Sequence, residues 1–284
     1  MMDKIRLWLS LVRFSHTLFA LPFAVAGWLV GSHGRFEART FLLVVLCMAT
    51  ARNAAMAFNR LIDRDIDATN PRTAQRDIPA GRITPRGATI FVISNCLLFV
   101  LLSWLLNPLC FALSPLALVL VLGYSLAKRF TSLCHVWLGL AIGISPMAAS
   151  IAASGRFSVV PAMLGAVLWT WMTGFDIVYA TQDEVHDKDL GLHSIPAAFG
   201  RSGSMRIAAI LHFGTLGLLV LTGRLAGWGI PWHVATAVCG GVLLWMHAFR
   251  SDDDLSLQSG FFKANIALSA TVLAGVAAQV LGPR

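Results

Sequence analysis

Charged side chains are scarce in this chain. Asp, Glu, Lys and Arg together make up 13% of its 284 residues, whereas 57% of the residues are hydrophobic, and the mean hydropathy is +0.72. Soluble domains carry about a quarter charged residues. The shortage of charge therefore excludes an ordinary soluble domain and favours a protein of the lipid bilayer.

Cysteine is also scarce, and its placement excludes two further classes of site. The five cysteines lie in or beside apolar runs, without the paired spacing of zinc or iron–sulfur ligands or of a disulfide framework. The net charge of +8 could indicate nucleic acid. However, the basic residues stand in short segments between apolar runs, where such residues orient a membrane protein. We therefore expect a bilayer environment and no nucleic-acid partner.

Long apolar runs predict an all-α integral membrane protein, a bundle of about nine transmembrane helices. The predicted spans are 14–33, 40–61, 87–106, 109–127, 134–153, 159–181, 204–223, 229–249 and 261–281. An odd number of spans places the two termini on opposite faces. Most lysines and arginines fall on the same face as the N-terminus, so we expect a multi-pass protein of the cell's inner (cytoplasmic) membrane with a cytoplasmic N-terminus.

Acidic residues are rarer than basic ones, and more than half of the 14 gather in two clusters. The first cluster lies at the predicted cytoplasmic end of the second span, where Asn59, Asp63 and Asp67 recur every fourth residue. In a continuous helix this spacing aligns the three side chains along one face. The second cluster closes the sixth span and contains Asp176, Tyr179, Gln182, Asp183 and Asp187.

The two clusters match each other. Asp63/Asp67 and Asp183/Asp187 share the spacing D-x-x-x-D, and an Ile-Pro-Ala sequence follows each pair. The match indicates an internal repeat. We therefore expect a single domain over residues 1–284, built from two four-helix units, about 10–130 and 131–250, and a final helix.

Carboxylates grouped at a helix end repel one another unless a cation neutralises them. Paired oxygen ligands suit magnesium, which commonly bridges one or two carboxylates to substrate phosphates. Nearby segments carry the opposite charge, because Arg72 and Arg76 follow the first cluster and Lys128 and Arg129 end the fourth span. Acidic groups for a metal and basic groups for phosphate, beside an apolar interior, indicate a lipid diphosphate site. We expect it in a central cavity that opens near the cytoplasmic face.

The first cluster resembles a motif of the UbiA superfamily of intramembrane prenyltransferases, which includes 4-hydroxybenzoate polyprenyltransferases. The family motif N-D-x-x-D-x-x-x-D is met by Asn59, Asp63 and Asp67. Arg60 departs from it, since many members have aspartate there. We expect Asn59 and Asp63 to keep the role in metal binding.

The resemblance extends over nearly the whole chain. Residues 176–200 resemble the second family motif, and the Tyr-x-x-x-Lys-Arg pattern that ends the family's fourth span is present as Tyr124, Lys128 and Arg129. Segments 13–24 and 191–196 look like a bacterial branch of the family. Some members of that branch are assigned to menaquinone synthesis by the futalosine route.

The resemblance implies an enzyme of the EC 2.5.1 class. It would move a polyprenyl group from polyprenyl diphosphate to a hydroxylated aromatic acid, either 1,4-dihydroxy-6-naphthoate or 4-hydroxybenzoate, in menaquinone or ubiquinone biosynthesis. It also implies two magnesium ions that hold the diphosphate, one at Asn59, Asp63 and Asp67 and one at Asp183 and Asp187. The diphosphate-binding residues would be Arg72, Arg76, Lys128 and Arg129.

Other residues are candidates for acceptor binding and proton transfer. Asp176 is either the base that removes the ring proton or a hydrogen-bond partner of Tyr179. Arg13 and His16 could contact the acceptor's carboxylate, and Arg13 could equally be a topology anchor. His193 either contacts a substrate or structures its loop. The predicted site is completed by Tyr124, Tyr179 and Gln182.

Other functional classes fit the pattern less well. A secondary transporter also has internal repeats and intramembrane carboxylates, but it places these acids near mid-bilayer rather than at span ends. A lipid-binding or assembly protein would explain the basic segments but not the duplicated acidic spacing. A diphosphate hydrolase, a terpene-cyclase-like enzyme or a prenyltransferase with a non-quinone acceptor is the nearest enzymatic alternative.

Overall fold

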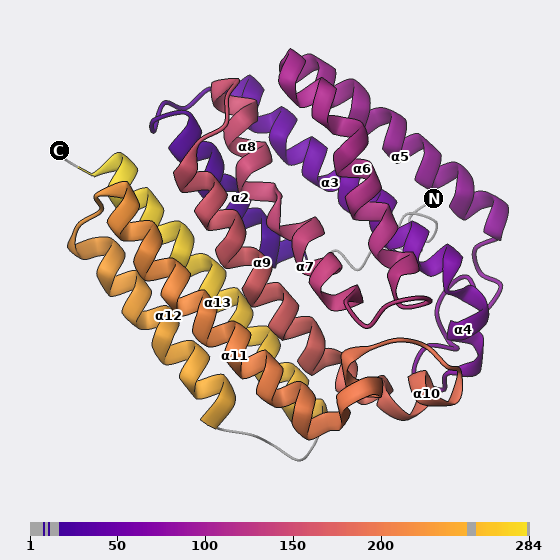
Figure 1. Ribbon diagram of the computed structural model, residues 1–284. Coiled ribbons are helices and arrows are strands. Elements are labelled where there is room, and N and C mark those ends of the chain that lie inside the picture. The colour runs from indigo at the N-terminus through magenta and orange to yellow at the C-terminus, as the bar shows by residue number, and fades with distance from the viewer. Residues whose placement is uncertain (1–7, 9–10, 12–16, 249–253, 283–284) are drawn as a thin grey trace.

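The computed structural model describes residues 8, 11, 17–248 and 254–282, and over this part of the chain every regular element is a helix (Figure 1). The long helices are α2 (Thr17–Gly31), α3 (Ala38–Ile62), α5 (Pro85–Leu106), α6 (Pro108–Ala127), α9 (Val159–Ala180), α11 (Ile195–Ala226), α12 (Ile230–Ala248) and α13 (Asp254–Leu281). The short ones are α4 (Arg64–Thr69), α7 (Cys134–Gly143), α8 (Ser145–Ser154), η2 (Thr181–Asp183) and α10 (Glu184–Asp189).

Each predicted span coincides with a helix or with a pair of helices. Seven segments within the described residues are long and apolar enough to cross a membrane, and α2 contributes a shorter apolar helix, Ala20–Gly31. The all-α membrane fold is therefore confirmed, whereas the count of nine spans stays a prediction. The helices α5 and α6 are the least buried, as expected of segments that face lipid.

Local sequence signals explain where several helices begin. Thr84, Asn107 and Ser194 are the N-caps of α5, α6 and α11, and the side-chain oxygen of each accepts a backbone N–H from the first helical turn. Pro85 and Pro108 stand in the first turn, where a backbone N–H has no partner within the helix. The starts of the third and fourth predicted spans therefore follow from ordinary capping chemistry.

Two spans differ in shape from the prediction. The predicted span 134–153 is divided into α7 and α8 at Ile144, because Pro146 begins the second helix and lacks a backbone N–H. The predicted span 204–223 is extended to Ile195–Ala226, with a kink at Gly200, whose φ is 68° and ψ 174°. These angles are accessible essentially to glycine alone. The segment before Gly200 therefore belongs to the second acidic motif and not to the apolar span.

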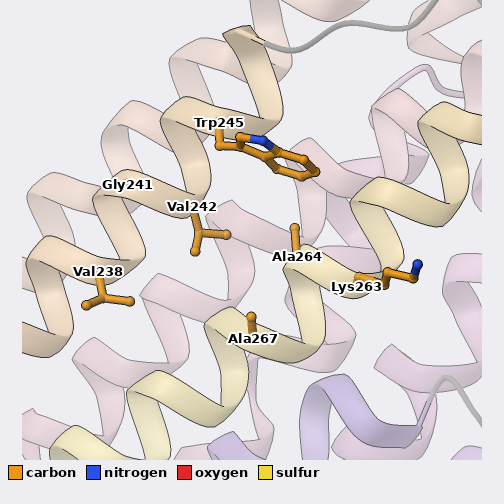
Figure 2. Close-up of a pocket in the computed structure, with 7 residues that line it drawn as sticks. All are labelled: Val238, Gly241, Val242, Trp245, Lys263, Ala264 and Ala267. Carbon is orange, nitrogen blue, oxygen red and sulfur yellow. The ribbon is translucent and has the colours of Figure 1, made fainter.

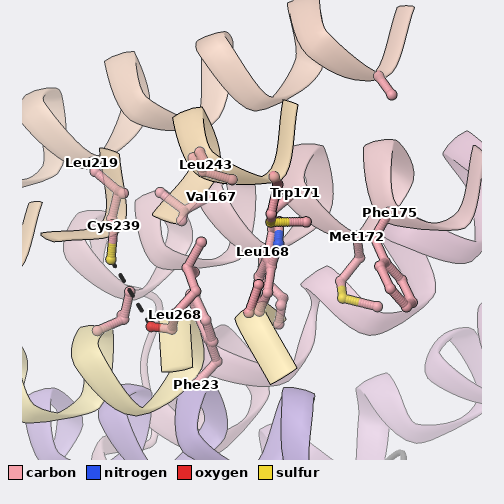
Figure 3. Packing of buried hydrophobic residues seen from close by; sticks show 14 of the residues in the cluster. Phe23, Val167, Leu168, Trp171, Met172, Phe175, Leu219, Cys239, Leu243 and Leu268 are labelled. Carbon is pink, nitrogen blue, oxygen red and sulfur yellow. Dashed lines mark hydrogen bonds between the residues drawn. The ribbon is translucent and has the colours of Figure 1, made fainter. Parts of the chain in front are cut away.

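The core of the bundle is built around α9. In its apolar stretch 61% of the residues are buried, against 11% in that of α6. Figure 3 shows its side chains Val167, Leu168 and Trp171 packed among residues of α2, α11, α12 and α13. Trp171 is fully buried. Because α9 leads directly into the second acidic motif, this packing fixes the position of that motif.

Very close backbone contacts also hold the helices around the site. A Cβ atom added at Gly139 of α7 would lie 2.2 Å from Thr173 Oγ1 of α9, so only glycine allows these two helices to approach as they do. In Figure 1 the short helices α4 and α10 lie at the same end of the bundle, and α13 ends at the opposite end. The two acidic motifs are thus brought together at one end.

Candidate active site

The two acidic motifs have the same local backbone geometry. Helix α3 ends at Ile62, and Asp63 (φ −89°, ψ 5°) begins the six-residue helix α4. In the second motif, Asp183 (φ −99°, ψ 5°) begins the six-residue helix α10. The prediction that the carboxylates align along one continuous helix is therefore wrong, because each motif bends at its central aspartate.

Asp63 is the most enclosed carboxylate of the first motif. Its side chain is 3% exposed, and its Oδ2 atom lies 2.7 Å from Lys128 Nζ. The Asn59 amide donates to the same oxygen at 3.2 Å, and Arg129 Nη2 lies 3.4 Å from Oδ1. Arg129 also donates to the carbonyl oxygen of Ile62 at 2.7 Å. The end of the fourth predicted span therefore closes over the first motif.

Asp67 and Asp183 are each held by an arginine of the segment that follows the first motif. Arg76 Nη1 donates to both oxygens of the buried Asp67, at 2.6 and 2.8 Å. Arg72 donates to Asp183 through Nε, at 3.1 Å, and through Nη2, and the Asn70 amide donates to the same carboxylate at 3.0 Å. Arg72 and Asn70 thus join the first motif to the second.

The charge of Asp183 also affects Arg72. Burial lowers the pKa of the Arg72 guanidinium. The hydrogen bond to Asp183, the charge of Asp183 and smaller contributions from Tyr179 and Asp67 together outweigh burial, so the pKa of Arg72 is raised above its ordinary value. Arg72 Cζ lies 5.7 Å from the ring centroid of Tyr179. The arginine is therefore a fixed cation between the two motifs.

The donor set fits magnesium, although the carboxylates are now paired with cations. Within the described residues no three His, Cys, Asp or Glu side chains form a ready metal cluster. The side chains that do converge offer oxygen atoms from aspartates and from Asn59, the ligands that magnesium prefers. Magnesium bound through one or two carboxylates and substrate phosphates does not require an all-protein cage.

The other predicted residues of the second motif surround this centre. Asp187 lies within electrostatic reach of Asp183 and Lys128. Gln182 donates its side-chain amide to the carbonyl oxygen of Tyr179 at 3.1 Å. His193 is exposed, and its backbone N–H donates to the Lys128 carbonyl at 2.7 Å. This bond fixes the backbone of the loop and involves no imidazole atom, so both predicted roles of the His193 side chain stay predictions.

A second group of polar side chains lies deeper, between α3, α6, α7 and α9. His135 Nδ1 lies 2.6 Å from Asp176 Oδ2. Tyr124 lies within electrostatic reach of Asp176 and Asp63, and Arg52 within reach of Tyr124. Arg52 precedes Asn59 by two helical turns and therefore shares its face of α3. These electrostatic interactions link the acidic motifs to a charged residue in the middle of a predicted span.

Sequence reasoning missed three of these residues. Asn70 is marked in the sequence only as a polar residue before Pro71, shortly after the first cluster. His135 is marked as a histidine at the edge of an apolar run. Arg52 could have been found as a charged residue in the middle of the predicted span 40–61. The predicted acceptor residues Arg13 and His16 lie outside the described residues.

A groove of about 460 Å³ between α12 and α13 is separate from this site. Figure 2 shows Trp245 and Lys263 at one part of the groove and small apolar residues along the rest. None of the residues that line it belongs to either acidic motif.

The comparisons with known sequences agree with this arrangement. Residues 20–269 match the UbiA prenyltransferase family. A 4-hydroxybenzoate octaprenyltransferase of Burkholderia cenocepacia (strain HI2424) is 30% identical, with 99% of each chain covered. Another, from Tolumonas auensis, is 31% identical, with 84% of this chain and 81% of the relative covered.

Solved structures show the same fold. A UbiA homologue of Aeropyrum pernix K1 superimposes with a TM-score of 0.82 at 32% identity, and 92% of this chain and 96% of that chain are covered. A UbiA homologue of Archaeoglobus fulgidus, bound to GPP and Mg²⁺, gives a TM-score of 0.75 at 21% identity, with 95% and 99% covered. The chain therefore belongs to the UbiA prenyltransferase family and is a membrane prenyltransferase.

Proposed function

We propose that the protein transfers a polyprenyl group from polyprenyl diphosphate to the ring of a hydroxylated aromatic acid and releases diphosphate. The acceptor would be 1,4-dihydroxy-6-naphthoate or 4-hydroxybenzoate, in menaquinone or ubiquinone biosynthesis. The observation that carries the proposal is the convergence of two aspartate motifs with Arg72, Arg76, Lys128 and Arg129 at one end of an apolar bundle. The names of the curated relatives support the aromatic acceptor.

Metal binding follows from the same arrangement. We propose that Asn59, Asp63 and Asp67 hold one magnesium ion and that Asp183 and Asp187 hold another. The Archaeoglobus homologue bound to GPP and Mg²⁺ supports the use of magnesium. When bound, the ions would stabilise negative charge on the leaving diphosphate. The basic residues would bind the phosphate oxygens through charge-assisted hydrogen bonds.

The transfer itself needs a base and protection from water. An electron pair of the electron-rich ring forms the bond to the first carbon of the prenyl chain, and the carbon–oxygen bond breaks with its electrons on diphosphate. The ring carbon then loses its proton, and the electron pair of that C–H bond restores the aromatic ring. We assign the removal of this proton to Asp176 of the second cluster, which is partly exposed and, like Asp63, interacts electrostatically with Tyr124. Enclosure by the helices excludes water, which would otherwise capture the reactive prenyl group.

Arg52 is the residue that best suits the acceptor's carboxylate. It lies two turns, or about 10 Å, before Asn59 in α3 and on the same face of the helix. An arginine inside a span is costly and usually functional. Its neighbour Tyr124 is also a neighbour of Asp176, so a carboxylate held at Arg52 places the ring near the proposed base. Arg13 and His16 are the alternatives for this role.

Orientation and domain organisation complete the proposal. We propose nine spans with the N-terminus, both motifs and the basic segments at the cytoplasmic face of the inner membrane, and a central cavity that opens there. The matching bends at Asp63 and Asp183 support two repeats, about 10–130 and 131–250, and a final helix.

One assay separates this proposal from its alternatives. Purified protein is incubated with magnesium, radiolabelled polyprenyl diphosphate and a panel of aromatic acids, and the products are separated. Label in a prenylated ring supports the proposal. Release of prenyl alcohol without any ring product would instead indicate a diphosphate hydrolase. Unchanged substrate would favour the transporter hypothesis. Asp183→Ala is the matched inactive control.

A further inference from the structure

A buried histidine–aspartate pair joins α7 to α9 beside the proposed reaction centre. His135 is the second residue of α7 and only 4% exposed. Its Nδ1 lies 2.6 Å from Oδ2 of Asp176, whose side chain is 28% exposed. The histidine is thus enclosed in the protein, whereas the aspartate side chain is partly exposed.

The chemistry of the pair fixes the direction of its hydrogen bond. An ionised carboxylate can only accept, so Nδ1 carries the proton and donates it to Oδ2. This bond restricts the rotation of the Asp176 side chain and occupies one of its two oxygens. The second oxygen, Oδ1, is then held in one position as a hydrogen-bond or proton acceptor.

A purely structural role explains the pair poorly. Helices α7 and α9 are already joined by the Trp169 indole N–H, which donates to the Val136 carbonyl at 2.9 Å, and by the close approach at Gly139. His135 Nε2 is buried and has no hydrogen-bond partner in the described part of the chain. Such an unsatisfied atom costs about 1–3 kcal/mol, which a small polar or apolar residue at this position would avoid.

We propose that His135 is a positioning residue of the transfer reaction. By donating Nδ1–H to Oδ2, it aims Oδ1 of Asp176 at the ring proton of the acceptor. That proton moves to Oδ1 as the C–H electron pair returns to the ring, and it leaves with the diphosphate or to water when the products depart. The inference rests on the proposed function, because it assumes an aromatic acceptor and Asp176 as the base.

The test measures how fast the ring proton leaves. Full-length protein is given geranyl diphosphate, magnesium and a mixture of 4-hydroxybenzoate with hydrogen or deuterium at the two ring carbons beside the hydroxyl. We expect proton loss to follow the slow step in the wild type, which would then show no discrimination against deuterium. His135→Ala should be roughly tenfold to hundredfold slower and should discriminate clearly against deuterium.

Matched variants separate positioning from packing. The Asn side-chain amide places a donor close to the position of Nδ1, so His135→Asn should recover both the rate and the wild-type isotope discrimination, whereas His135→Gln, whose donor lies further out, should not. Trp169→Phe removes another α7–α9 hydrogen bond. We expect this variant to lose stability without acquiring an isotope effect.

Two kinds of failure can be told apart. If the wild type prenylates no aromatic acid at all, the proposed function falls, and this inference falls with it. If the wild type is active but His135→Ala shows no deuterium effect, or if His135→Asn behaves like His135→Ala, then His135 does not position the base. In that case only the present inference is overturned.

Discussion

Lys128→Gln is the substitution that most directly tests the site between the two motifs. Lys128 Nζ is 2.7 Å from an Asp63 carboxylate that is 3% exposed. Removing one partner of a buried ion pair typically costs about 3–5 kcal/mol. Asp63 keeps the Asn59 amide at 3.2 Å and Arg129 at 3.4 Å, so we expect a smaller loss of stability, about 2 kcal/mol.

The effect on catalysis should be specific to one substrate. If Lys128 binds diphosphate, the variant loses a charge-assisted hydrogen bond of about 1.5–3 kcal/mol. The rate constant at low polyprenyl diphosphate should then fall roughly tenfold to hundredfold. The KM for the aromatic acid should change far less, because the acceptor is bound elsewhere.

The assay is a two-substrate steady-state analysis in detergent, together with thermal unfolding. Lys188→Gln is the matched control, because Lys188 pairs with Glu184 at 2.7 Å and is 48% exposed. Such an exposed pair is worth at most about 1 kcal/mol. If Lys128→Gln leaves the kinetics for the diphosphate unchanged, Lys128 does not bind diphosphate and acts only as a positive-inside anchor. The placement of the diphosphate between the two motifs then loses the support of this residue.

Three further predictions concern metal, acceptor and topology. Asp63→Ala and Asp183→Ala should each abolish turnover while the protein stays folded. EDTA should abolish the turnover of the wild type. Near wild-type activity of either variant in the presence of EDTA would refute the two-metal proposal. Arg52→Gln should raise the KM for the aromatic acid by roughly tenfold or more and leave the KM for the diphosphate unchanged. If Arg13→Gln shows this result and Arg52→Gln does not, the acceptor site lies at the first span. A reporter fused to the C-terminus should lie outside the cytoplasm, and a cytoplasmic reporter would remove one span.

The helices were the most predictable part of this protein. An apolar run of about 20 residues has few alternatives to a helix in a bilayer, because every backbone polar group must be satisfied internally. The capping residues Thr84 and Asn107 add local information about where helices begin. The division at Ile144 was less visible, since Pro146 can also begin a helix without an interruption of the apolar pattern.

The site was predicted as a set of residues but not as a geometry. A spacing of four is compatible with a continuous helix, and nothing in the spacing reveals the bends at Asp63 and Asp183. Which arginine meets which aspartate depends on the path of an irregular segment, so the bond from Arg72 to the distant Asp183 could not be read from the sequence. His135 was missed because the position of α7 relative to α9 is a tertiary property.

The ion pairs at the two motifs also have a consequence for how the binding of metal and the binding of diphosphate depend on each other. The aspartates proposed for the metal already neutralise the cations proposed for the phosphate, as in Asp63–Lys128, Asp67–Arg76 and Asp183–Arg72. Metal alone would displace a guanidinium or ammonium and leave it uncompensated, and diphosphate alone would do the same to a carboxylate. Arriving together, they exchange partners with each pair and leave no isolated charge beside the hydrocarbon. This implies strong mutual reinforcement between the two ligands, which thermodynamic linkage requires to be equal in both directions.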